Sequence, residues 1–169
     1  MPAMSPIVIR KSRKADKEQF IRLVRELAKF ERLEPPSPAG SRRLADAVFG
    51  RRKINLIVAA EGKKLVGYAL YFFTYSSFLA KPSLYLEDLF VLGEYRKRGV
   101  GFALFRRCVD EAVSNGCGRM EWAVLTWNQK AMEFYDRLGA KRLSDWYVYR
   151  LDEEGLSKVP MTTRQGNDG

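Results

Sequence analysis

The stretch Leu84-Tyr-Leu-Glu-Asp-Leu-Phe-Val-Leu92, followed by Gly93-Glu-Tyr-Arg-Lys-Arg-Gly-Val-Gly101, decides how this chain folds. Its first part is an apolar run with the length and composition of a buried strand. Its second part is a polar turn that contains glycines and basic residues. After the turn, apolar residues recur at helical spacing from Phe102 to Val113. The stretch therefore predicts a strand, a glycine-containing turn and a helix in direct succession.

The turn has the properties of a phosphate-binding site. Gly99 and Gly101 carry no side chain, so backbone amides can close on an oxyanion, and the following helix adds the positive end of its dipole. The segment from Glu94 to Arg107 contains five basic residues and one acidic residue, so its net charge is +4. We interpret the turn as a site for a pyrophosphate. The same pattern is also typical of an ordinary solvated basic turn, and its spacing matches neither a Walker loop nor a dinucleotide fingerprint.

Outward from this stretch, apolar periodicity and turn residues predict the remaining elements. An apolar stripe begins after Asp16 and ends before the prolines of 35–38, and Ser41 is expected to cap a second, short helix. The order of elements predicts an α/β fold with one mixed β-sheet in one domain. Further strands are expected at 7–10, 54–60, 65–75, 119–125 and 146–151, and a last helix at 128–138.

Composition excludes several functional classes. The chain has 169 residues, 46% of them hydrophobic, which is enough for one domain with a sizeable core. No apolar run approaches the length of a membrane span, so we expect no membrane segment. The chain has no histidine and two cysteines, Cys108 and Cys117, which excludes histidine-based triads and dyads and leaves no metal site to expect. This cysteine usage, with no signal segment at the start, predicts a cytoplasmic protein.

The net charge of +10 and the pI of 9.8 indicate that the protein attracts anions. A nucleic acid, a phosphorylated cofactor or a basic surface without a specific partner would each be consistent with this charge. No helix-turn-helix, zinc or RNA-recognition pattern accompanies it. A basic nucleic-acid-binding module is therefore the alternative from another class, and it rests on charge alone.

Two further features could carry chemistry. Glu87 and Asp88 stand inside an apolar strand, where a carboxylate is costly unless it is paired or functional. Strand alternation predicts that they point to opposite faces, and one of them could be purely structural. On the helix at 128–138, Ala131 and Tyr135 are four residues apart and share a face. Taken alone, Tyr135 could equally be a half-buried core aromatic.

Together these segments resemble a known family. Leu-Tyr-Leu-Glu-Asp-Leu-Phe-Val, then Tyr-Arg-x-x-Gly-x-Gly, then Trp-Asn-x-x-Ala-x-x-Phe-Tyr-x-x-Leu-Gly-Ala stand in the order typical of the GNAT superfamily of acetyl-CoA-dependent N-acetyltransferases. Within it, the likeness is greatest to the spermidine/spermine and diamine (thialysine) acetyltransferases. The resemblance implies a single-domain GNAT fold over 7–151, a mixed, mostly antiparallel sheet with splayed central strands, and a homodimer. It leaves 1–6 as a disordered or extended start and 152–169 as a tail, flexible from 161.

The resemblance also implies a set of site residues. The end of the strand would pair with the pantetheine arm of acetyl-CoA, the turn would hold the pyrophosphate, and the helix at 128–138 would contact the pantetheine region. Tyr135 would be the general acid beside the thioester sulfur, and Glu87 the candidate base, acting through water. A carboxylate and a phenol can perform this proton chemistry in a chain without histidine. The implied cofactor-binding residues are Leu89, Phe90, Val91, Arg96, Lys97, Arg98, Gly99, Val100, Gly101, Phe102, Asn128, Ala131 and Tyr135.

The acceptor implied by the resemblance is a primary amine on a small cationic molecule, such as a diamine, a polyamine or a lysine-like amino acid. Direct attack on the thioester in a ternary complex would transfer the acetyl group. Prolines and arginines follow Glu34 where polyamine acetyltransferases usually carry further acids, so spermidine itself is the weaker expectation. A protein N-terminus or a protein lysine remains an alternative acceptor. The implied substrate-binding residues are Glu26, Glu31, Glu34, Tyr75 and Asp88.

Overall fold

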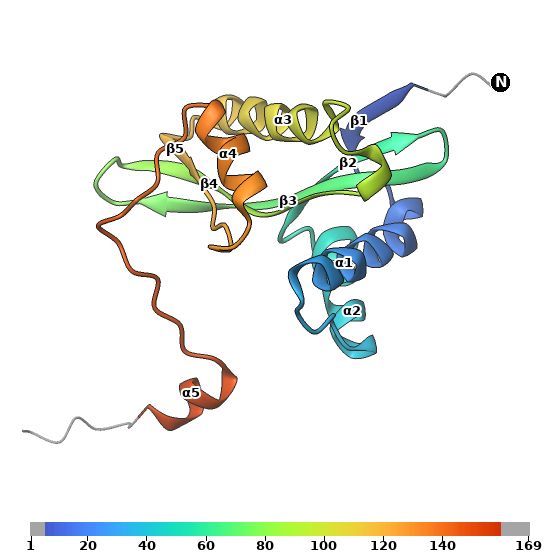
Figure 1. The fold of residues 1–169 in the computed structure, drawn as a ribbon. Helices are drawn as coiled ribbons and strands as arrows, with labels where there is room; N and C mark the ends of the chain where they lie inside the picture. The colour runs from blue at the N-terminus through green and yellow to red at the C-terminus, as the bar shows by residue number, and fades with distance from the viewer. Residues whose placement is uncertain (1–5, 160–169) are drawn as a thin grey trace, which may run out of the picture. The chain divides into compact units, whose positions relative to one another are not determined.

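One mixed β-sheet organises residues 6–123 in the computed structural model, which describes residues 6–159 of the chain (Figure 1). The strands lie in the order β1-β2-β3-β4-β5, and the first three pairings are antiparallel while β4 and β5 are parallel. This confirms the expected α/β fold with a mixed, mostly antiparallel sheet. The strands are β1 (Ile7–Lys11), β2 (Asn55–Glu61), β3 (Lys64–Ser76), β4 (Lys81–Val91) and β5 (Arg119–Glu121).

β5, the edge strand of the described sheet, pairs with β4 over three residues only. Parallel pairing joins β5 to β4 only from Ser83 to Tyr85. From Leu86 to Val91, β4 keeps its antiparallel partner β3 on one side, while no strand of the described residues pairs with its other edge. Apart from the Val91 carbonyl, which accepts a hydrogen bond from Nε of Arg96, the backbone groups along that edge have no strand partner and are available to a ligand.

Helices cover both faces of this sheet (Figure 1). One face carries α1 (Lys17–Glu31) and α2 (Pro38–Ala45), and α3 (Val100–Ser114) packs on the other. Residues 124–159 belong to a second compact unit, whose helices are α4 (Gln129–Arg137) and α5 (Glu153–Lys158). No helix among the described residues has the length and hydrophobicity needed to cross a bilayer.

The core beneath α1 is aromatic. Phe20, fully buried, places its ring edge-on against Tyr68 of β3 at 5.2 Å and against Phe49 at 6.1 Å between centroids. Leu23 and Leu27 follow on the same helical face and are also buried. Burial of one such side chain stabilises the fold by about 1.5–3 kcal/mol. The apolar stripe that predicted this helix is therefore the stripe that fixes α1 on the sheet.

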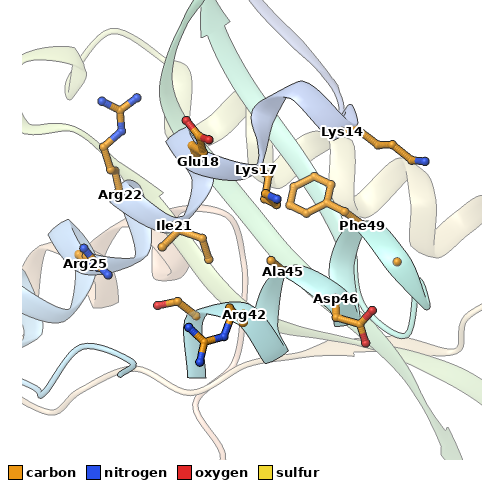
Figure 2. Close-up of a pocket in the computed structure, with 12 residues that line it drawn as sticks. Lys14, Lys17, Glu18, Ile21, Arg22, Arg25, Arg42, Ala45, Asp46 and Phe49 are labelled. Carbon is orange, nitrogen blue, oxygen red and sulfur yellow. The ribbon is translucent and has the colours of Figure 1, made fainter. Parts of the chain in front are cut away.

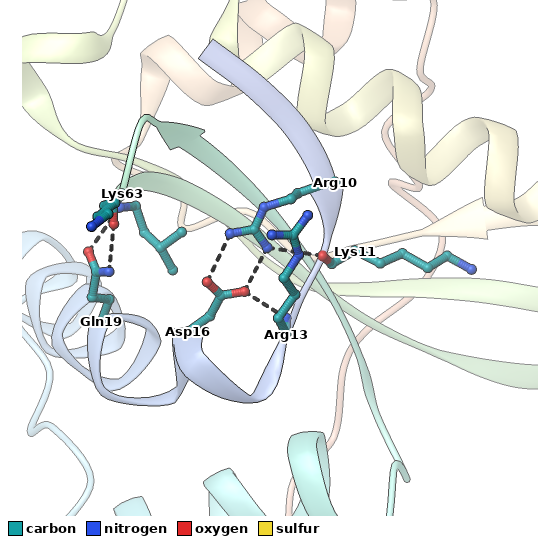
Figure 3. A network of polar contacts seen from close by, with 7 residues as sticks. Arg10, Lys11, Arg13, Asp16, Gln19 and Lys63 are labelled. Carbon is teal, nitrogen blue, oxygen red and sulfur yellow. Dashed lines mark hydrogen bonds and ion pairs between the residues drawn. The ribbon is translucent and has the colours of Figure 1, made fainter. Parts of the chain in front are cut away.

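Polar contacts fix the start of α1 (Figure 3). The buried carboxylate of Asp16 accepts both arms of the Arg10 guanidinium, at 2.7 and 2.9 Å, and the backbone N–H of Arg13 at 2.6 Å. Burial opposes the charged form, but these donors together hold the pKa of Asp16 below its ordinary value. One turn further on, the Gln19 amide donates to the carbonyl of Lys63 and accepts from the N–H of Leu65. The helix is thereby tied to β1 and to the β2–β3 hairpin.

Two local expectations were wrong. The second helix begins at Pro38 and its cap is Ser37, whose hydroxyl accepts the N–H of Gly40 at 3.0 Å. Pro38 occupies the first turn, where a missing N–H costs nothing, and Ser41 is buried inside the helix. The strand expected at 146–151 is absent; those residues are exposed, and no described strand satisfies their backbone groups. Of the strand expected at 119–125, only β5 (Arg119–Glu121) forms.

The expected domain limits remain predictions. Residues 1–5 and 160–169, which include most of the expected disordered start and flexible end, lie outside the described residues.

Candidate active site

A β-bulge places the two carboxylates of β4. Leu70 of β3 pairs with Asp88, and the next residue, Tyr71, pairs with Leu86, so Glu87 is the extra residue of the bulge. Bulges re-aim side chains and are common beside active sites. Here Glu87 is exposed while Asp88 is partly buried. The simple alternation expected from the sequence is therefore modified at this pair.

Asp88 lies in a small cluster with Tyr68 and Glu31. The Tyr68 hydroxyl donates to Oδ2 of Asp88 at 3.1 Å. Burial raises the pKa of Asp88 to about 6; the Tyr68 hydrogen bond lowers it, and the charges of Glu87 and Glu31 raise it further. Burial also raises the pKa of Glu31, which lies half-buried at the C-terminal end of α1. The cluster therefore concentrates negative charge in a partly desolvated place, which suits a cation.

Tyr68 is the member of this cluster that sequence analysis missed. It is fully buried, and burial followed by the charge of Asp88 raises its pKa well above its ordinary value. Its hydroxyl is therefore a neutral donor at physiological pH. The only sequence signal was an aromatic residue in the long strand now assigned to β3, which does not reveal a partner twenty residues away.

The basic turn has the backbone that anion binding needs. Gly99 caps α3 with φ +77°, and Lys97 has φ +59°, so both are in the left-handed region. An added Cβ at Gly101 would meet only the Cγ2 of Val91 at 3.9 Å, an ordinary contact. The start of α3 is therefore open on the side where the backbone would approach a phosphate. Phe102 follows, half-exposed, while Val100 is buried.

Two of the basic side chains of the turn, Arg96 and Arg98, lie against aromatic rings. Arg96 donates from Nε to the carbonyl of Val91 at 2.8 Å, and its guanidinium carbon lies 4.5 Å from the Phe30 ring centroid. Arg98 lies over the Tyr95 ring at 5.0 Å. Arg96 therefore fastens the turn to the end of β4 and to α1, in addition to supplying charge.

The last residues of β4 adjoin this turn. Phe90 and Val91 are buried and Leu89 is half-buried, and all three lie on the segment whose outer edge has no partner strand. The site thus combines a free strand edge, a turn with left-handed residues and a helix N-terminus. These features fit a ligand with an extended arm ending in a pyrophosphate, as acetyl-CoA has.

In the second unit, α4 forms as expected. Asn128 is its N-cap, and its side-chain oxygen accepts the N–H of Ala131 at 3.2 Å. Ala131 and Tyr135 share one helical face and are half-buried. The Tyr135 ring lies edge-on to Phe134 at 5.1 Å. Gly139, with φ +80°, follows the end of the helix.

The other expected substrate residues do not join the carboxylate cluster. Glu26 and Glu34 are exposed, and no hydrogen bond or ion pair of the described residues links them to Asp88. Tyr75 is 70% exposed near the hairpin end of β3. It is five residues along the strand from Leu70, the partner of Asp88, which is about 17 Å at the rise of a strand. Within the described residues, no group of three or more Cys, Asp or Glu is placed to hold a metal ion.

Comparison with known proteins defines the class. The sequence profile of the acetyltransferase (GNAT) family matches residues 21–140. The chain therefore belongs to the GNAT family and is an acetyl-CoA-dependent N-acetyltransferase. An integron cassette protein from the mobile metagenome of V. cholerae has the same fold, with a TM-score of 0.76 and 25% identity over 90% of this chain and 96% of that one.

Among its relatives, the thialysine N-epsilon-acetyltransferase of Bos taurus is 32% identical over 168 residues, which is 92% of this chain and 98% of the relative. The L-ornithine N5-acetyltransferase of Arabidopsis thaliana is 38% identical over 107 residues, which is 63% of this chain and 44% of that protein. Both relatives are named for acetylation of an amino group on a small amino acid.

Proposed function

We propose that this enzyme acetylates the primary amine of a small cationic molecule, such as a diamine or a lysine-like amino acid. The observation that carries the proposal is the cluster of Glu31, Asp88 and Tyr68, with Glu87 beside it. The similarity to thialysine and ornithine acetyltransferases supports the same acceptor class.

In this proposal Asp88 and Glu31 receive the cationic end of the acceptor. Desolvation raises the pKa values of both carboxyl groups, and the charges of Glu87 and Glu31 raise that of Asp88 further, so a bound ammonium group would relieve the repulsion at Asp88. The Tyr68 hydroxyl holds one oxygen of Asp88 and leaves the other oxygen for the substrate. Asp88 is thus positioned to bind a cation once it is ionised, above about pH 6.

The residues that would hold acetyl-CoA are those at the free edge of β4, in the turn after it and at the start of α3. Leu89, Phe90 and Val91 would offer backbone groups to the pantetheine arm. Bound there, acetyl-CoA supplies an activated acetyl group to the amine. The residues proposed for the phosphates are Arg96, Lys97, Arg98, Gly99, Val100, Gly101 and Phe102, and those proposed for the pantetheine region on α4 are Asn128 and Ala131.

Two residues are proposed to move protons. A primary amine has a reference pKa near 10.4, so the enzyme must remove a proton from the bound ammonium before it can attack. Glu87, exposed at the bulge, is the proposed base through a water molecule. Tyr135 is the proposed acid for the departing thiolate. Asp88 and Glu87 thus have separable roles, binding and proton removal.

We further propose that the enzyme acts as a homodimer. The segment 143–151 leaves most of its aromatic and apolar side chains exposed, from 58% at Leu151 to 90% at Tyr149. An exposed apolar segment of this kind is typical of an interface. Sedimentation should therefore give twice the mass of the chain.

An amine panel tests the proposed acceptor. Free-thiol release from acetyl-CoA is measured with putrescine, cadaverine, ornithine, thialysine, spermidine and a short peptide with a free N-terminus. Small diamines and lysine-like amino acids should give the highest kcat/KM. In the same assay, Asp88→Asn should mainly raise KM, whereas Glu87→Gln should mainly lower kcat. Turnover with the peptide alone would overturn the proposed acceptor class.

A further inference from the structure

A hollow of about 800 Å³ lies between α1 and α2 (Figure 2). Its size is within the range of small-molecule sites. Ile21 of α1 and Phe49 point into it from opposite sides, and Ala45 of α2 lies between them. None of the residues that line it belongs to the proposed acetyl-transfer site.

The rim of this hollow is strongly basic. Its cations come from both helices and from the turn before α1, and two carboxylates, Glu18 and Asp46, accompany them, which leaves a net charge of +3. Asp46 is already paired with Arg51 at 2.7 Å, whereas none of the five cations has an ion-pair partner among the described residues. The five cations are Lys14, Lys17, Arg22, Arg25 and Arg42.

The basic rim belongs to a segment that carries most of the net positive charge of the chain. Residues 10–53 contain 14 Lys and Arg against six Asp and Glu, so a net +8 of the chain's +10 lies in this segment. The acceptor proposed above is a cation and cannot account for it. Like charges gathered at one place repel, and an anionic ligand would remove that cost.

The floor of the hollow offers an aromatic surface. The Phe49 ring contacts Phe20 of the core edge-on at 6.1 Å, yet Phe49 is only half-buried. A π-helical turn, Asp46–Gly50, carries it, and the N–H of Arg51 donates to the carbonyl of Asp46 at 2.7 Å. π-Helical turns are rare in proteins as a whole, but those that occur are frequently found at functional sites.

We propose that this hollow binds a nucleoside di- or triphosphate, with the base against Phe49 and Ile21 and the phosphates on the surrounding arginines and lysines. An apolar, partly aromatic floor with several converging cations matches a ligand that is aromatic at one end and multiply charged at the other. A concave site of this volume favours a free nucleotide over a nucleic-acid strand.

Calorimetric titration with ATP tests the proposal on the full-length chain. Arg42→Gln and Arg22→Gln should each weaken ATP binding about tenfold or more, as expected for loss of one charge-assisted contact. Arg43→Gln is the matched control, because Arg43 neighbours Arg42 on α2 but does not line the hollow; its affinity should stay as in the unsubstituted protein. Tripolyphosphate should bind at least tenfold more weakly than ATP, since it has no base to place on Phe49.

Gly101→Asp separates this site from the basic turn proposed for acetyl-CoA. ATP affinity should survive this substitution, whatever happens to acetyl transfer. Loss of ATP binding in Gly101→Asp, or unchanged ATP binding in both Arg42→Gln and Arg22→Gln, would overturn the proposal. A single-stranded oligonucleotide that binds more tightly than ATP and displaces it would also overturn it, in favour of a nucleic-acid surface.

Discussion

Replacement of Asp88 by Asn should stabilise the protein in a strongly pH-dependent way. The pKa of Asp88 is raised from 3.8 to about 6 in the folded state, chiefly by burial. Between these two values the folded chain binds more protons than the unfolded chain, so the free energy of unfolding falls as the pH rises. Asn has nearly the same shape, can still accept the Tyr68 hydrogen bond at its oxygen, and has no charge to desolvate.

The size of the effect follows from the shift of about two pH units. Each unit corresponds to about 1.4 kcal/mol, so the raised pKa of Asp88 costs the folded state about 3 kcal/mol at pH 7.5 and less than about 1 kcal/mol at pH 4, where Asp88 is mostly protonated in the folded state. The stability of Asp88→Asn relative to the unsubstituted protein should therefore rise by about 2 kcal/mol between pH 4 and pH 7.5.

Urea denaturation at several pH values measures this difference directly. Comparison of the variant with the unsubstituted protein at each pH removes the contribution of all other titrating groups. A stability difference that stays constant from pH 4 to pH 7.5, or one that moves against the variant as the pH rises, would refute the argument that Asp88 is held in a desolvated, negatively charged cluster.

Three further predictions concern the reaction. Gly101→Asp should abolish acetyl-CoA binding in calorimetry with an unchanged melting temperature, because an added Cβ at Gly101 meets only Cγ2 of Val91 at 3.9 Å; unchanged affinity would move the phosphate site elsewhere. Tyr135→Phe should lower kcat by about 10²–10⁴ with little loss of acetyl-CoA affinity, and a kcat within threefold of normal, with chemistry rate-limiting, would rule out the general-acid role. For a diamine, kcat/KM should rise with pH through about 6, because Asp88 ionises there. This rise should be absent from the pH profile of Asp88→Asn. A rise that persists in the variant would belong to another group.

Local features of the sequence predicted the fold well. The apolar stripe that ends at Phe30 and the strand-turn-helix stretch that begins at Leu84 each depend on residues close together in the chain. The turn lies where the sequence predicted it but ends two residues earlier than expected, because Gly99, with a left-handed φ, caps α3 and the helix begins at Val100. The long-range pairings were less accessible, because a bulge at Glu87 changes which side chains share a face and no local pattern marks it.

Failures of sequence analysis have physical reasons as well. Ser41 and Ser37 are both good caps, and the choice depends on Pro38, whose ring suits the first turn of a helix. Segment 146–151 has the composition of a strand, but a strand exists only where another strand satisfies its backbone groups. Tertiary structure places Glu31 and Asp88, two of the five residues expected to bind substrate, together with Tyr68, and the roles of all five stay predictions.

The preference for a doubly charged acceptor tests the central claim most directly. The measurement is the ratio of kcat/KM for 1,4-diaminobutane to that for butylamine, which has the same chain length and no second amine. The unsubstituted enzyme should favour the diamine tenfold or more, and Glu31→Gln should reduce this preference several-fold through KM, while Glu18→Gln on the same helix should not. Equal kcat/KM for the two amines, or a preference that Glu31→Gln leaves intact, would contradict the assignment of the carboxylate cluster as the site that receives a cationic acceptor.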